Sequence, residues 1–301
     1  MQFRQSIKRQ VLENSENSIQ NIMQSLAWND SIYRTFNEGL RLARIYDSQR
    51  QLPNSLVEYI HIAHVSYVSI ALRKLYDKKK EGRSSVNSIR TISEQISDNA
   101  HLVTRLNYLT HDGTPYELSK DLDFRVRMTV TGRHAQFDQL CGLRSGARRK
   151  PNDLLHQQIA DILKNRAVLR KDIEDFANKF VAHAAAESNR PDEKKAFGDV
   201  TLNRVQSQYK NAIWAVQLIG KILDEAILTQ LPVPTFDVLM NWDNGLFTQK
   251  IKRKLNRYWD SRMNWWSRWY DCYRDSQRLY LSPNKEFASS QWAEFKKEMC
   301  T

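Results

Sequence analysis

Glycine, proline and cysteine are all rare in this chain of 301 residues, with 9, 7 and 3 copies. Strand-rich folds need many turn residues, so the scarcity of glycine and proline favours long helices. Cys141, Cys272 and Cys300 are far apart and odd in number. They argue against a disulfide framework and against a zinc knuckle, and they fit a reducing compartment.

Long apolar runs are also missing. No stretch of about 18 apolar residues occurs, and residues 1–18 have no apolar core of signal-peptide length. We therefore expect a cytoplasmic protein without a membrane partner. No P-loop, Gly-rich dinucleotide turn or nucleophile elbow is present, which predicts no cofactor. His61 and His64 are spaced for a metal, but Glu58 is the only carboxylate nearby, so a structural role is favoured and no metal is expected.

Positive charge is in excess, because 46 lysine and arginine residues face 34 aspartate and glutamate residues, a net charge of +12. Such a charge favours a polyanionic partner, namely nucleic acid or an acidic membrane surface. A basic balance also occurs in proteins with neither partner, so the charge alone does not choose between these classes.

The pattern of apolar residues predicts an all-α fold, an up-and-down helical bundle. Residues 1–50 indicate two helices broken near residues 28–30, where Asn29 or Asp30 can cap the second helix. Residues 56–76 are apolar on nearly every face, which predicts a helix in the middle of the bundle.

Two further segments carry a core-facing stripe at three- and four-residue steps. The first begins at Pro151 and is expected to continue as one helix to about Ala186. The second spans residues 200–228.

Two segments break this helical pattern. Residues 123–131 alternate apolar and polar side chains, so we expect either a short strand or an irregular crossover there, within a basic insertion at 112–150. The two prolines at 231–234 cannot continue a helix. They divide a bundle of residues 1–230 from a C-terminal helical extension of residues 231–301.

The C-terminal extension has a basic and an aromatic side. At helical period, one side carries Lys250, Arg253, Arg257 and Arg268. The opposite side carries Leu255, Trp259, Trp266, Tyr270 and Tyr273. We expect the aromatic side to pack on the bundle and the basic side to bind phosphate or to remain an ordinary solvated face. Arg148 and Arg149 of the insertion would extend the basic surface if their loop folds toward the same side.

Residues 176–185, FANKFVAHAA, place a histidine in an otherwise apolar helical run. His183 falls on the apolar stripe, and Lys179 lies one turn before it. One interpretation is a bundle histidine hydrogen-bonded to a neighbour. The other is chemistry, because a histidine can move a proton near neutral pH, while Lys179 and Asn178 can contact a phosphate.

This stretch resembles the signature helix of the HEPN superfamily (higher eukaryotes and prokaryotes nucleotide-binding domains), in particular the AbiU-type group associated with abortive infection. Asn178, Ala182 and His183 match the motif, and residues 69–77, SIALRKLYD, resemble that group's central helix. The resemblance covers roughly residues 50–230. It implies a HEPN-like bundle, a homodimer with a composite site, and metal-independent action on RNA with His183 as the acid/base group.

The motif's arginine is absent, because positions 176–178 hold Phe, Ala and Asn. Two functions therefore stay open. One is an RNA-directed defence or toxin protein, with metal-independent endoribonuclease activity and an antitoxin as partner. The other is a catalytically inactive scaffold that binds nucleic acid or a protein. A third interpretation, protein recognition through an aromatic tail, requires an exposed patch formed by Trp265, Trp266 and Trp269.

Overall fold

The computed structural model of the chain describes residues 2–12, 18–46, 52–77, 88–143, 147–178, 200–225 and 248–275. The regular elements in these ranges are all helices, which confirms the all-α helical bundle. In chain order they are α1 (Gln2–Leu12), α2 (Ile19–Tyr46), α3 (Asn54–Tyr76), α4 (Ile89–Asp98), the 3₁₀ turn η1 (Ala100–Leu102), α5 (Arg105–Thr110), α6 (Phe124–Cys141), α7 (Gln157–Arg166), α8 (Lys171–Phe176), α10 (Leu202–Leu223) and α11 (Gln249–Asp275).

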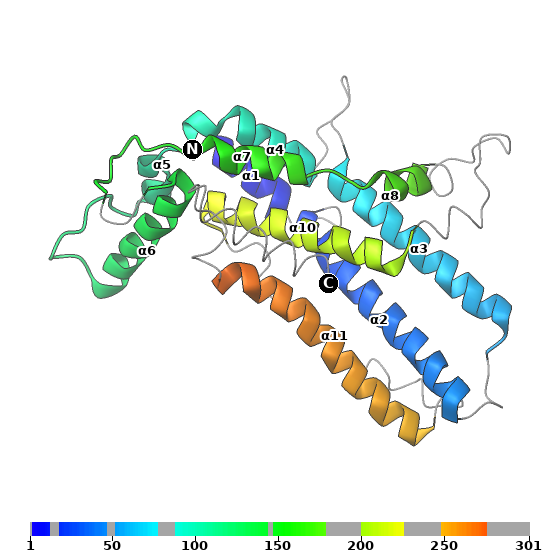
Figure 1. Cartoon of the computed structure of the whole chain (residues 1–301). Coiled ribbons are helices and arrows are strands. Elements are labelled where there is room, and N and C mark those ends of the chain that lie inside the picture. The colour runs from blue at the N-terminus through cyan, green and yellow to red at the C-terminus, as the bar shows by residue number, and fades with distance from the viewer. Residues whose placement is uncertain are drawn as a thin grey trace.

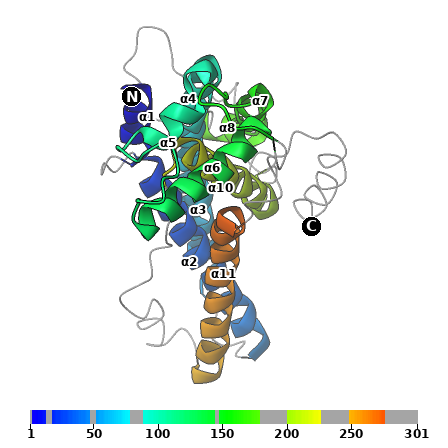
Figure 2. The ribbon, with the colours of Figure 1, turned by 90° about the vertical axis from the view of Figure 1, so that its left-hand side faces the viewer.

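The helix α10 occupies the centre of the bundle. It contacts α3, α4, α7 and α11, while α11 lies along α2 (Figures 1 and 2). The short helices α5 and α6 pair with each other at one end of the molecule.

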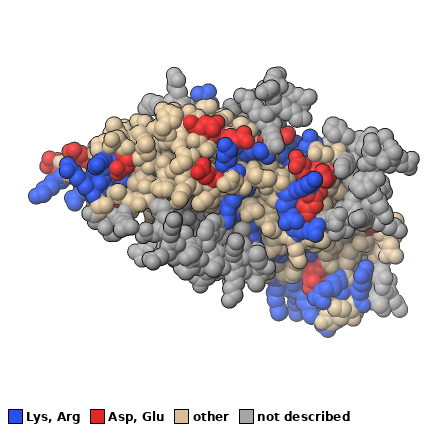
Figure 3. All heavy atoms as spheres, turned by 45° about the horizontal axis from the view of Figure 1, so that its top comes forward, with Lys and Arg blue, Asp and Glu red and all other residues tan. Residues whose placement is uncertain are grey.

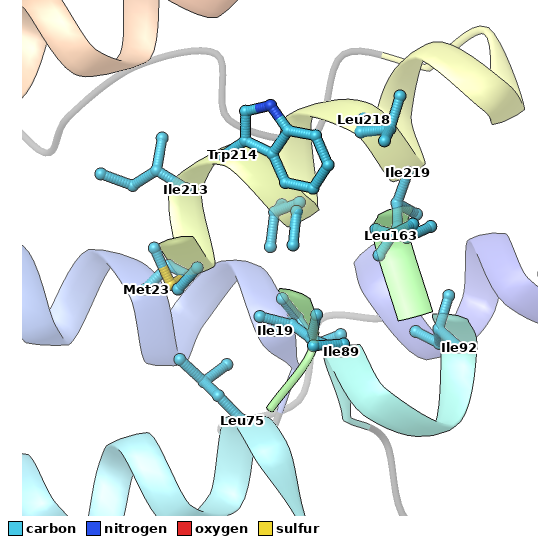
Figure 4. Close-up of a cluster of buried hydrophobic side chains, with 14 of the residues drawn as sticks. Ile19, Met23, Leu75, Ile89, Ile92, Leu163, Ile213, Trp214, Leu218 and Ile219 are labelled. Atoms are coloured by element: carbon cyan, nitrogen blue, oxygen red, sulfur yellow. The ribbon is translucent and has the colours of Figure 1, made fainter. Parts of the chain in front are cut away.

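The core forms where α10 meets its neighbours. Side chains of α2, α3, α4, α7 and α10 converge there (Figure 4), namely Ile19, Met23, Leu75, Ile89, Ile92, Leu163, Ile213, Trp214, Leu218 and Ile219. Full burial of one such aliphatic side chain stabilises the fold by about 1.5–3 kcal/mol. The helix α10 begins after Thr201, whose side chain accepts a hydrogen bond from the Arg204 amide. It ends at Asp224, whose φ of 52° lies in the left-handed region.

The helix α3 is central over only half of its length. Leu72 and Leu75 are fully buried, whereas Tyr59 is 70% exposed and Leu56 is 42% exposed. The prediction of a helix in the middle of the bundle is therefore wrong for the first half of α3. By length and apolar composition α3 is the one helix in the described part that could cross a membrane, and a core helix of a soluble protein meets the same criteria. The cytoplasmic location stays a prediction.

Residues 123–131 form neither a strand nor an irregular crossover, because Asp123 caps the helix α6 and residues 124–131 belong to it. The Asp123 side chain accepts a hydrogen bond from the Arg125 amide at 2.8 Å, and the helix ends at Gly142, whose φ of 71° suits glycine. Phe124 and Met128 are 72% and 58% exposed, so two members of the alternating apolar set face away from the core.

The stripe from Pro151 onward is divided between two helices, α7 and α8, so the expectation of one continuous helix is wrong. The chain leaves helical geometry at Ala167. The Gln208 side chain of α10 donates to the Val168 carbonyl at 3.2 Å and satisfies a group that a continuous helix would have bonded internally.

Candidate nucleic-acid interface

The helix α11 is amphipathic in the way that its sequence predicts. Ile251 and Leu255 are buried against Leu42 and Ala43 of α2. Trp266 is fully buried beside Tyr209 of α10, with ring centres 5.2 Å apart. The apolar side therefore packs on the bundle, as expected.

The opposite side of α11 carries exposed cations. Lys250, Arg253 and Arg257 are all exposed. Arg253 and Arg257 form no ion pair with any residue that the structure describes. Arg268 lies within α11, but its side chain is outside the described residues. The predicted basic side is thus present over the first half of the helix.

Tyr46, the last residue of α2, fixes two of the cations. The Lys250 and Lys254 ammonium groups lie 4.7 and 4.4 Å from the centre of its ring, and Lys254 donates to its hydroxyl at 2.6 Å. The hydrogen bond and charge of Lys254 lower the pKa of Tyr46. Sequence reasoning missed Lys254, although its position one turn after Lys250 places it on the same edge of the helix.

We define the basic face as Lys250, Arg253, Lys254 and Arg257. Figure 3 shows lysine and arginine side chains gathered at the end of the molecule where α2 ends and α11 begins. At the opposite end, near α6, basic and acidic side chains are mixed. The basic face is therefore the more suitable of these two surfaces for a polyanion.

A groove continues the basic face along α11. It has a volume of about 400 Å³. Its lining side chains are Arg257, Asp260, Ser261, Asn264 and Trp265. Because these positions stand three, four, seven and eight residues after Arg257, they share one side of the helix with it.

A buried charge cluster anchors α11 to the bundle. The Asp30 carboxylate of α2 is fully buried and accepts a hydrogen bond from Arg34 and one from Arg262 of α11, each at 2.7 Å. The Arg34 and Arg262 side chains are 12% and 10% exposed. The prediction of Asp30 as a cap is wrong, since α2 runs through residues 28–30 without a break.

The two histidines of α3 pack beside this cluster. The Tyr33 ring stacks on His64 with centres 3.7 Å apart, and His64 Nδ1 is 2.6 Å from the Asn29 side-chain oxygen. Burial lowers the pKa of His64 to about 4. His61 contacts the Tyr33 hydroxyl. Both rings thus have protein partners, and no group of three or more metal-ligating side chains occurs among the described residues.

The basic loop after α6 does not join the basic face. Arg149 pairs with Asp138 of α6 at 2.7 Å, and Arg148 is exposed. Figures 1 and 2 place α6 and the start of α11 at different ends of the molecule. The same Asp138 also pairs at 2.7 Å with the fully buried Arg105, so this region is held by internal ion pairs. The loop therefore does not meet the condition under which Arg148 and Arg149 would extend the basic surface, and their role in binding stays a prediction.

The histidine motif falls largely outside the described residues. Asn178 is half-buried and follows α8, whereas Lys179 and His183 are beyond the described range. Trp266 is fully buried and Trp265 packs partly on the core, so these two do not form the exposed aromatic patch that a protein-recognition tail requires. Trp269 lies in α11 with its side chain outside the described residues.

No protein-family model, curated protein or solved structure matched this chain. The candidate interface therefore depends on the geometry of α11 alone.

Proposed function

We propose that this protein is an RNA-binding helical scaffold, and that the basic face of α11 holds the RNA backbone. The observation that carries the proposal is the set of exposed cations on one side of a helix whose other side is buried. The ammonium group of lysine and the guanidinium group of arginine bind phosphates without regard to base sequence. The resemblance of residues 176–185 to the HEPN signature makes RNA the polyanion that we propose.

An acidic membrane is a weaker partner for this surface. Interfacial helices insert an apolar side between lipid headgroups. In α11 the apolar side is already packed on the bundle, because Trp266 is fully buried and the centre of the Trp259 ring lies 5.8 Å from the centre of the Trp28 ring of α2. A phosphate backbone needs only the charged side, which is free of the bundle.

The test is the affinity of the full chain for a fluorescent single-stranded RNA at several salt concentrations. Three phosphate contacts give a slope of about −2 for log K against log salt, so binding weakens about 20-fold between 50 and 200 mM salt. In a variant with Lys250→Glu, Arg253→Glu and Arg257→Glu, we expect binding to collapse together with its salt dependence.

A matched variant separates this surface from net charge. Arg125→Glu, Arg127→Glu and Arg148→Glu change the charge equally at exposed positions near the other end of the molecule. We expect this variant to keep the wild-type slope. Equal loss in both triple variants, or salt-insensitive binding by the wild type, would show that the basic face is not the interface.

The same RNA tests the endoribonuclease that the resemblance implies. The wild type and His183→Ala are incubated with RNA and a chelator. Cleavage by the wild type alone would assign chemistry to His183, whereas equal cleavage by both, or none by either, would leave the binding scaffold. The homodimer and the antitoxin partner stay predictions.

A further inference from the structure

The groove on α11 differs chemically from the basic face that leads into it. The basic face offers cations, whereas the described residues that line the groove combine the cation Arg257 with a tryptophan, an amide, a hydroxyl and a carboxylate. Arg257 belongs to both surfaces. A phosphate backbone that follows the basic face is therefore led to the mouth of the groove.

Trp265 is held in place as part of the groove wall. The Arg262 guanidinium lies 4.7 Å from the centre of its ring, and the Trp266 ring meets it edge to face at 5.1 Å. Arg262 is itself fixed by Asp30. A ring that is held in advance loses little freedom when a ligand stacks on it, which favours binding.

The polar groups of the groove are available to a ligand. Arg257, Asp260 and Asn264 are exposed, and within the described part of the chain Arg257 and Asp260 form no ion pair although they are three residues apart. A carboxylate accepts hydrogen bonds only, so Asp260 suits the amino group of a base or a ribose hydroxyl. An amide both donates and accepts, so Asn264 suits a base edge.

The geometry points to a site for one unpaired nucleotide of single-stranded RNA in this groove, an inference that rests on the proposed function. Arg257 holds the phosphate, Trp265 stacks on the base, and Asp260 and Asn264 bond to its edge or its ribose. Bases in a duplex are stacked on each other and cannot enter. The groove therefore makes the protein prefer single strands, which the basic face alone does not.

The test uses a 12-nucleotide RNA with one central 2-aminopurine, as a single strand and as a duplex of equal length. Stacking of a base on an aromatic ring contributes about 1–3 kcal/mol, so Trp265→Leu should weaken single-strand binding by about 5- to 150-fold. Duplex affinity should stay within about 2-fold of the wild type, since no base reaches the ring. The wild type should quench the 2-aminopurine fluorescence, and Trp265→Phe should retain part of that quenching.

A second pair of variants keeps the test independent of core packing. Asn264→Ala removes a groove amide from an exposed position, and the loss of one hydrogen bond weakens single-strand binding by about 2- to 12-fold. Asn256→Ala changes an amide that is also exposed, on another side of α11, and should leave affinity unchanged. Thermal unfolding of each variant confirms that it is folded.

The outcomes separate the two proposals. If the wild type binds single strand and duplex equally, and if reversal of Lys250 and Arg253 abolishes both, the nucleotide site is wrong and the RNA-binding basic face stands. If Asn264→Ala and Trp265→Leu bind the single strand like the wild type, the nucleotide site is also wrong. If the wild type binds neither RNA, both proposals are wrong.

Discussion

Replacing Asp30 by asparagine should destabilise the protein strongly, because it removes a fully buried carboxylate that pairs with both Arg34 and Arg262. Each Asp30 oxygen accepts from one guanidinium at 2.7 Å, and Asp30 itself is fully buried. Asparagine fits the space but carries no charge. The Arg34 and Arg262 side chains, only 12% and 10% exposed, would then face each other without a counter-charge.

Removal of one member of a buried ion pair costs about 3–5 kcal/mol. We expect Asp30→Asn to lower the free energy of unfolding by about that amount, a large share of the 5–15 kcal/mol of a typical domain. Arg262→Met in the same chain removes one of the two guanidinium groups left without a carboxylate and should restore part of the lost free energy of unfolding. The double variant should therefore be more stable than the sum of the two single effects predicts.

Urea unfolding, followed by circular dichroism, measures these free energies. Asp121→Asn, at an exposed loop position, is the control and should change stability by under about 0.5 kcal/mol. Two results would refute the reasoning. One is an Asp30→Asn protein within about 1 kcal/mol of the wild type. The other is strict additivity with Arg262→Met, which would mean that the two groups do not interact.

Two further predictions concern the other buried polar groups. The pKa of His64 is about 4 in the folded protein and about 6.5 in an unfolded chain, so the unfolded state binds the proton first as pH falls. The contribution of His64 to stability should thus be constant above pH 6.5 and decrease by about 3 kcal/mol between pH 6.5 and 4. The wild type should therefore lose about that much more stability than His64→Gln over this range, and parallel pH curves for the two proteins would contradict this. Arg105→Met leaves Asp138 and Asp153 without their buried partner and should cost about 3–5 kcal/mol in urea unfolding, whereas Arg149→Met, at a more exposed partner of Asp138, should cost under about 1 kcal/mol. Equal costs for these two arginine variants would show that burial of the ion pair does not matter.

Periodic patterns in the sequence predicted those helices in which one side is buried and the other is solvated. The helix α11 is the best case, because its cations and its large apolar residues are separated by half a turn, and packing on α2 and α10 follows from that separation. The helix α10 was found for the same reason. The basic face could be predicted because it needs only the direction of side chains around one helix.

The pattern failed where tertiary contacts decide the local structure. In α6 the apolar alternation fits a strand equally well, and the helix is decided by the Asp123 cap and by burial of Val130 and Phe137 at helical spacing. Asp30 resembled a cap because carboxylates are rarely buried. Its true position requires Arg262, a partner that no local pattern identifies. The groove was missed as well, because Trp265 was considered from the sequence only as one member of an exposed patch that a third interpretation would require.

The Asp30 cluster joins parts of the chain that are synthesised at very different times. Arg34 follows Asp30 by four residues, so that pair can form as soon as α2 forms, whereas Arg262 is 232 residues away. Bringing such distant residues together costs about 5 kcal/mol of chain entropy, which the apolar contacts of α11 must offset. During synthesis on a ribosome, the Asp30 carboxylate is thus paired early with Arg34 and is joined by the Arg262 guanidinium only much later. Among the described helices, α11 is therefore the last to be secured, so the basic face that we propose as the RNA interface is completed only after the other described helices have been made.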